Sequence, residues 1–264
     1  MNLRLLASLL VAAVLCGCAT HSTKRPNAVE RNGIVPAQER PGLGTAWGEQ
    51  RESWAEPAPF ARASGERPAG RDRLYYNDRE GVNAMLDFLG GKSNRCDGLQ
   101  PSASGLVRMG LRIGNDRWTE SHELKGHRLA VSERGDRYEI VLKNDGRRAV
   151  EVVLSVDGLD VIDGKAASVK KRGYVMAPFE TLAVDGFRTS DTTVAAFRFG
   201  SVFDSYGRRR HGSAINAGVI GIAVFEEKRQ RTPTAPQISE PHAWRHVGTR
   251  PTPSGQQYAT PPDA

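Results

Sequence analysis

The segment His122-Glu123-Leu124-Lys125-Gly126-His127 contains the residue types of the zinc-binding helix HExxH. In that motif the two histidines are four residues apart, so both side chains face one metal ion. Here they are five residues apart, and on a helix their directions would differ by ~140°. Gly126 further weakens a helix at this point. We therefore expect no metal site, and no other pattern in the chain indicates a cofactor.

Three carboxylates lie close together in the segment VDGLDVIDGK, at Asp157, Asp160 and Asp163. Grouped carboxylates are the ligands that Ca²⁺ prefers, but this spacing matches neither an EF-hand loop nor a nonapeptide calcium repeat. Asp157 and Asp163 each precede a glycine, which is typical of turns. We interpret the three residues as turn residues.

No residue has the sequence context of a catalytic nucleophile. The segment Pro101-Ser102-Ala103-Ser104-Gly105 lacks the first glycine of a nucleophile elbow and does not lie between a strand and a helix. Glycine loops that bind phosphate are absent from the sequence. We expect a non-enzymatic protein, with an envelope-polymer hydrolase as a less favoured alternative, because paired carboxylates can come from distant positions.

An aromatic and basic cluster precedes the last apolar segment. It consists of Phe203, Tyr206, Arg208, Arg209 and Arg210. Loop residues of these types commonly contact glycans or proteins, so this cluster is the predicted binding surface, with a merely solvated loop as the alternative.

The chain carries a formal net charge of +7. A basic surface suits nucleic acid, an anionic membrane or cell-wall carboxylates. No recognition helix, RNA-binding strand motif or zinc-finger spacing accompanies the charges, so nucleic acid is not an expected partner.

The first residues have the layout of a secretory leader. Arg4 precedes the apolar run Leu5–Leu15, which is shorter than the about 20 residues that span a bilayer. The segment Leu15-Cys16-Gly17-Cys18 that follows resembles the lipobox of bacterial lipoproteins. The resemblance implies cleavage before Cys18, lipid attachment to its thiol and a membrane anchor. Because Ala19 rather than Asp follows, it also implies a place in the cell envelope at the outer membrane.

Cys96 is then the one thiol left in the mature chain. An intrachain disulfide is impossible in that case. We interpret Cys96 as a small, partly buried residue rather than as a reactive thiol.

Composition divides the chain into segments. Residues 1–17 are the expected signal peptide, and residues 18–73, rich in Arg, Pro, Gly, Ser and Glu, are the expected flexible tether. Trp47, Trp54 and Phe60 are unusual in a tether because their exposure to water is unfavourable. They are possible docking residues, either on the domain or on a partner.

Residues 74–104 are expected to form a short helix and a loop that pack on the domain. Val82, Met85, Leu86 and Leu89 recur with helical spacing, Asp78 or Asn77 can cap the start, and glycines end the helix.

Residues 105–227 contain short alternating segments separated by turn residues. Tyr138, Ile140 and Leu142 share one face of such a segment, while the last segment, Val219–Phe225, is apolar on both faces and is expected to be central. This pattern predicts a mainly β domain, an antiparallel β-sandwich of jelly-roll or immunoglobulin-like type with one short helix. Residues 228–264, rich in Pro, Thr and Gln, are the expected disordered tail.

The run from YEIVLKN to GVIGIAVF is similar to uncharacterised proteobacterial envelope proteins, and the layout of lipobox, tether and sandwich resembles Gram-negative accessory lipoproteins. The resemblance carries no catalytic residue. Together these observations predict a membrane-anchored, non-enzymatic binding or assembly module whose partner is another envelope protein or a glycan. The alternative is a carbohydrate-binding domain for peptidoglycan or lipopolysaccharide.

Overall fold

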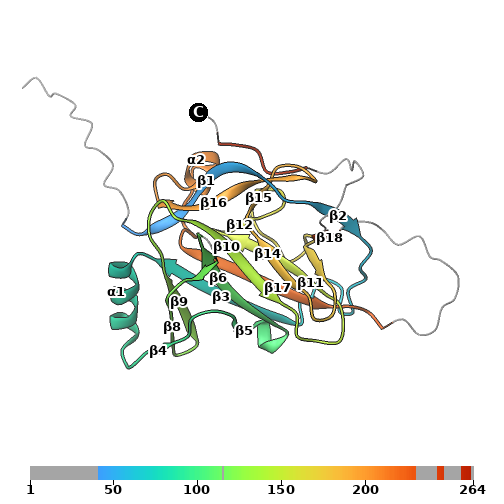
Figure 1. The fold of residues 1–264 in the computed structure, drawn as a ribbon, viewed down its shortest axis with the longest axis horizontal. Coiled ribbons are helices and arrows are strands. Elements are labelled where there is room, and N and C mark those ends of the chain that lie inside the picture. Colours follow the sequence, from blue (N-terminus) through green and yellow to red (C-terminus); the bar gives the residue numbers. More distant parts are fainter. Residues whose placement is uncertain (1–40, 115, 230–242, 247–256, 263–264) are drawn as a thin grey trace, which may run out of the picture. The chain divides into compact units, whose positions relative to one another are not determined.

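The computed structural model describes residues 41–114, 116–229, 243–246 and 257–262, and within them two β-sheets face each other across a shared apolar core (Figure 1). Sheet A contains β1 (Leu43–Glu52), β5 (Gln100–Ser102), β6 (Val107–Ile113), β7 (Arg117–Trp118), β10 (Arg137–Lys143), β14 (Thr181–Val184), β15 (Gly186–Arg188) and β16 (Thr193–Ser201). Sheet B contains β2 (Ala55–Ala58), β3 (Gly70–Asn77), β4 (Asn94–Arg95), β8 (Ser121–Leu124), β9 (His127–Val131), β11 (Val150–Val156), β12 (Leu159–Asp160), β13 (Tyr174–Met176), β17 (Val219–Glu226) and β18 (Ala243–His246).

The mainly β fold predicted from the sequence is confirmed. Sheet A has the order β1-β16-β10-β6-β5, and sheet B has the order β2-β18-β13-β11-β17-β3-β9-β8-β4. Neighbouring strands run antiparallel, except that β3 pairs with β9 and β13 pairs with β18 in parallel. The parallel pairs depart from the purely antiparallel arrangement that the turn spacing indicated.

Strand β17 is central and buried, as its two apolar faces predicted. It pairs with β11 on one side and with β3 on the other. Ile220, Ile222 and Val224 face the core between the sheets, whereas Ala223 and Phe225 join a second apolar cluster on the opposite face.

The predicted tether over residues 18–73 is wrong from Leu43 onward, because β1, β2 and the start of β3 belong to the sheets. Strand β1 pairs with β16, so that Leu43 lies opposite Ser201. Glycines at 44 and 48 let the strand approach its neighbours closely, since a Cβ at Gly48 would lie 2.4 Å from the carbonyl oxygen of Ala196. The rest of the tether lies outside the described residues.

The predicted tail over residues 228–264 is also partly ordered. Backbone pairing places β18 between β2 and β13. Ala259 is buried, and its N–H donates to the carbonyl of Arg188 at 2.9 Å. The folded unit is therefore longer at both ends than the predicted range 105–227.

The helices lie outside the sheets (Figure 1). Helix α1 (Arg79–Leu89) begins as predicted at Asp78, whose carboxylate accepts from the N–H of Gly81 at 2.7 Å, and it ends at Gly90. A second helix, α2 (Tyr206–His211), and the 3₁₀ turn η1 (Ala103–Gly105) were not predicted. Among the described residues, no helix is both long and apolar enough to cross a bilayer.

A buried polar network joins the two sheets. The Asp157 carboxylate accepts from the N–H of Thr45 at 2.6 Å, from the Tyr76 hydroxyl at 2.6 Å and from the N–H of Gly218 at 2.9 Å. Thr45 Oγ1 lies 2.7 Å from the Tyr76 hydroxyl oxygen and 2.6 Å from that of Tyr138. Because the Tyr76 hydroxyl donates to the carboxylate, it accepts from Thr45 Oγ1, and Thr45 Oγ1 in turn accepts from the Tyr138 hydroxyl.

Burial raises the pKa of Asp157 to about 6, although the hydrogen bonds from Tyr76, Thr45 and Gly218 favour its charged form. Burial and the nearby Asp157 charge raise the pKa of Tyr76 and of Tyr138 well above the ordinary tyrosine value. No positive side chain offsets the carboxylate in this network, so its hydrogen bonds carry the stabilisation.

We expect Asp157→Asn to lower the free energy of unfolding by about 1–3 kcal/mol at pH 7, because an amide NH₂ would face backbone and hydroxyl donors. Urea unfolding measures this change. Asp87→Asn, at an exposed position on α1, is the matched control, and an equal loss in both variants would contradict the assignment.

The network also predicts a pH dependence. The pKa of Asp157 rises from 3.8 to about 6 on folding, so the folded state gains extra stability from the protonated carboxyl; this part is complete below about pH 4 and is lost as the pH rises to about 6, while the hydrogen bonds remain. The free energy of unfolding, measured by urea titration, should fall less between pH 4 and pH 7 in Asp157→Asn than in the unmodified protein. Asp87→Asn should show the same fall as the unmodified protein.

Candidate functional site

A groove of about 620 Å³ lies on the outer face of sheet B, the face turned away from sheet A. Its floor is formed by the three central strands β3, β17 and β11. The lining comprises Arg71, Asp72, Arg73, Tyr75, Gly126, His127, Val153, Leu154, Ser155, Ala167, Ser168, Val169, Val219, Gly221, Ile222 and Ala223. Its volume falls in the range of about 300–1,000 Å³ that is usual for ligand sites.

Strand alternation determines which side chains face this groove. In β3, Leu74 and Tyr76 are buried in the core, so Arg71, Arg73 and Tyr75 project from the opposite face. Gly221 of β17 has no side chain to fill the groove, and a Cβ at this position would lie 2.6 Å from Ser155 Oγ.

The groove is positively charged. In the described part of the chain, Arg71 and Arg73 form no ion pair, and both side chains are exposed. Asp72 is the acidic residue of the lining, but its side chain lies on the inner face of β3, where Oδ2 accepts from Arg128 at 2.8 Å and from Ser102 Oγ at 2.8 Å. Arg128 therefore balances Asp72 from inside the sandwich, which leaves the two exposed arginines without a counter-charge.

One wall of the groove is aromatic. The rings of Tyr75 and His127 are 5.9 Å apart and tilted by 30°. His127 follows a tight turn in which Lys125 and Gly126 both have positive φ, the geometry of a two-residue hairpin. That turn fixes His127 at the edge of the groove.

The opposite wall, residues 167–169, is held by a buried arginine. Arg62 donates to the carbonyl of Val169 at 2.8 Å and forms an ion pair with Glu151 at 2.7 Å. Its guanidinium also lies 3.5 Å from the centre of the Phe225 ring. Because Glu151 is fully buried and paired, this wall is a fixed part of the fold.

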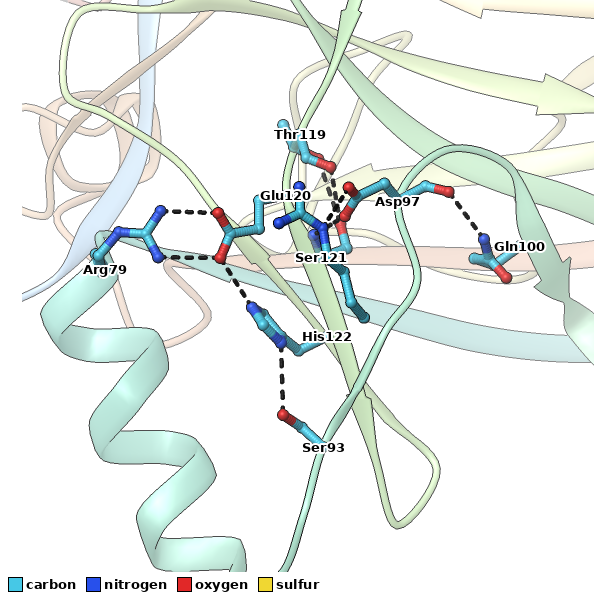
Figure 2. Close-up of polar contacts among 9 residues, drawn as sticks. Arg79, Ser93, Asp97, Gln100, Thr119, Glu120, Ser121 and His122 are labelled. Carbon is cyan, nitrogen blue, oxygen red and sulfur yellow. Dashed lines mark hydrogen bonds and ion pairs between the residues drawn. The ribbon is translucent and has the colours of Figure 1, made fainter.

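A second polar cluster lies where α1 meets β8 (Figure 2). Arg79 donates to both oxygens of Glu120 at 2.9 Å, and His122 Nε2 lies 3.0 Å from Glu120 Oε1. Ser93 Oγ lies 3.4 Å from His122 Nδ1, near the long limit of a hydrogen bond. Beside it, Asp97 accepts from the N–H of Ser121 at 2.9 Å.

Serine, histidine and glutamate in a row are also the components of a hydrolytic triad. In this cluster the bidentate Arg79 lowers the pKa of Glu120 to about 2, and its charge offsets the carboxylate charge that would stabilise an imidazolium in a triad. These residues line neither the groove nor the smaller cavity beside Asp157 and Asn216. We therefore assign the cluster to fastening the start of α1 and the segment around Ser93 to β8.

The predicted binding surface does not form as a unit. Tyr206 is buried beside Trp47 and Phe187, because it begins α2 on the side that faces the core. Phe203 is 56% exposed, and Arg208 and Arg209 are exposed on α2. Arg210 donates to Thr260 Oγ1 at 3.3 Å. Of the predicted surface, Phe203, Arg208 and Arg209 are exposed to solvent, whereas Tyr206 is not part of it.

The three aromatics assigned to tether docking are parts of the fold. Trp47 lies in β1, with its ring 6.2 Å from Phe187 and nearly parallel to it. Phe60 is buried in the second apolar cluster, and Trp54 is half-buried between β1 and β2. Cys18 lies outside the described residues.

The histidine and aspartate motifs have other roles. His122 and His127 lie on two strands of a hairpin, and His127 Nδ1 donates to the carbonyl of Lys125 at 3.2 Å. Asp160 accepts from backbone N–H groups of its own turn, and Asp163 accepts from Lys171 at 2.7 Å. Within the described residues, no three His, Cys, Asp or Glu side chains are grouped so as to hold a metal ion.

Cys96 is half-buried, and burial raises the pKa of its thiol. A raised pKa reduces the thiolate fraction at neutral pH.

The groove residues of β3 were missed because Arg71 and Arg73 fell in the predicted tether and Tyr75 fell in the segment 74–104 that was predicted to form a short helix and a loop. The alternation of Arg71, Arg73 and Tyr75 with Leu74 and Tyr76 was present, but Asp72 interrupts the apolar face. Comparisons with family models, curated proteins and solved structures found no match to this chain. The groove geometry is thus the main guide to function.

The polar cluster gives a local prediction. Glu120→Gln should speed hydrogen exchange at the amides of α1, because Arg79 loses its charged partner; the effect should be small and local, since this ion pair is exposed to solvent. The pKa of Glu120 is about 2 instead of 4.5, so the contribution is present at neutral pH and disappears as the pH falls from about 4.5 to about 2.

The control for this experiment is Asp145→Asn, which breaks the exposed ion pair with Arg108 in sheet A. Hydrogen exchange followed by mass spectrometry should show no change at α1 in that variant. Unchanged exchange at α1 in Glu120→Gln would show that the cluster does not fasten the helix.

Proposed function

We propose that this protein is a lipid-anchored, non-enzymatic binding module of the bacterial cell envelope, with the groove on sheet B as its binding site. The lipobox-like segment ending at Cys18 supports the anchor. Two or three acyl chains, each contributing about 0.8 kcal/mol per buried methylene, hold a protein firmly at a membrane.

The observation that carries the proposal is the composition of the groove. Two exposed arginines, without ion-pair partners among the described residues, and an aromatic pair lie over a floor that includes Gly221 and Ala223. The acidic residue of the lining, Asp72, is bound by Arg128 on the inner face of β3, whereas glycoside hydrolysis uses two carboxylates on opposite sides of one bond. This lining is better suited to holding a ligand than to cleaving one.

A photo-crosslinking amino acid at Ala167, an exposed residue in the groove wall, tests the site in intact cells. We expect a covalent adduct with an envelope component at this position. The same amino acid at Asn83, exposed on α1 and away from the groove lining, is the matched control. Equal capture at both positions, or none at Ala167, would refute the groove as the site.

The surviving part of the predicted surface on α2 supports a second candidate function, docking of another envelope protein. Phe203 is 56% exposed next to Arg208 and Arg209. Capture of a protein from position Arg209 but not from Ala167 would favour this candidate over the groove.

The anchor has its own test. Cys18→Ser should abolish incorporation of labelled palmitate and release the protein from outer-membrane fractions, because the acylated thiol is lost. Cys16→Ser and Cys96→Ser change the other two cysteines and should leave labelling intact. Labelling that persists in Cys18→Ser would contradict the lipoprotein assignment.

A further inference from the structure

The charge of the groove restricts the class of ligand. Several arginines of the fold have carboxylate partners, such as Arg62 with Glu151 and Arg112 with Glu139, whereas Arg71 and Arg73, both in the groove, have none among the described residues. Arg71 and Arg73 are two residues apart on one strand, so their Cα atoms lie about 6.5–7 Å apart along the groove. A guanidinium binds carboxylate or phosphate through two parallel hydrogen bonds, so an anionic ligand is favoured.

The shape of the groove points to sugar rings. Tyr75 contributes an aromatic ring to one wall, and its hydroxyl lies 3.4 Å from Arg73 Nη1. Ser155 lies opposite Gly221 on the floor, and its hydroxyl occupies the space that a Cβ at Gly221 would need. An aromatic face next to hydroxyl and guanidinium groups suits a ligand that is apolar on one side and rich in oxygen at its edges.

An extended peptide fits less well. Peptides commonly bind sheets by adding a strand at a free edge, where backbone groups are available. The central floor strand β17 is paired along its length with β11 on one side and β3 on the other. Strand β3 pairs with β9 over Leu74–Asn77, and β11 pairs with β13 over Val150–Val152. A ligand lying over β17 is therefore recognised through side chains.

We infer that the groove binds an anionic glycan, a chain of sugars carrying carboxylate or phosphate groups, with Arg71 and Arg73 on the charged groups and Tyr75 against a sugar ring. The inference rests on the proposed function, since it assigns a ligand class to the same groove. The carboxylate or phosphate groups of the glycan pair with Arg71 and Arg73, and a sugar ring displaces water from the Tyr75 ring.

Titration of the full-length protein in detergent tests the inference with four probes. Oligogalacturonate supplies carboxylates, a phosphorylated core oligosaccharide supplies phosphates, dextran is a neutral glycan, and oligoglutamate is an acidic peptide. We expect one or both anionic glycans to bind, with weaker binding at high salt, and dextran and oligoglutamate not to bind. Comparison of the first two probes identifies which charged group is recognised.

Matched variants separate the groove from general charge. Arg71→Gln with Arg73→Gln should weaken glycan binding by about tenfold or more, whereas Arg208→Gln with Arg209→Gln removes the same charge from α2 and should change it by less than about twofold. Tyr75→Ala should also weaken binding, and Tyr75→Phe should restore most of it, because the ring is retained. An unchanged thermal unfolding midpoint confirms that each variant is folded.

Equal losses in the two arginine pairs would overturn the inference, since binding would then depend on net charge alone. Binding of oligoglutamate with no effect of Tyr75→Ala would also overturn it, and the groove would remain a binding site for acidic peptides. If no probe binds while Ala167 still captures a component in cells, the glycan is wrong and the proposed module stands. If no probe binds and Ala167 captures nothing in cells, both the glycan inference and the proposed binding site in the groove are wrong.

Discussion

The buried carboxylate of Asp157 sets the relation between the two sheets. It follows β11 in sheet B, yet it accepts the N–H of Thr45 in sheet A and the hydroxyl of Tyr76 in sheet B. A charge in an apolar interior is tolerated when hydrogen bonds replace its lost hydration, so each donor must stay in place. The network therefore fixes the registers of β1 and β3, and with them which side chains of β3 point inward.

The groove follows from that register. Because side chains alternate along a strand, an inward Tyr76 requires an outward Tyr75, and the same rule exposes Arg71 and Arg73. Strand β17 contributes Ile220, Ile222 and Val224 to the core, and over the groove it places the small residues Gly221 and Ala223 on the outer face. One alternating pattern thus builds the apolar core on one face and a shallow charged surface on the other.

Elements with a complete local pattern were predictable from the sequence. The apolar alternation of β10, the two apolar faces of β17 and the capped periodicity of α1 each appear within about ten residues. Strand β3 was missed because its inner face includes Asp72, whose partner Arg128 is distant in the sequence. Helix α2 is too short to show periodicity, so buried Tyr206 was grouped with its exposed neighbours. The groove combines residues from several strands, and no single segment contains its pattern.

The topology also affects the order in which the chain can fold. Leu43 of β1 pairs with Ser201 of β16, and Leu74 of β3 pairs with Ile220 of β17, so the first strands of the unit are neighbours of the last long ones. Such non-local pairing slows folding, since long loops must close before these contacts form. Sheet A cannot be completed until β16 has been synthesised, and the centre of sheet B cannot form until β17 has been synthesised. A nascent chain that ends before β17 therefore lacks both the closed core and the groove, because β17 contributes to each of them.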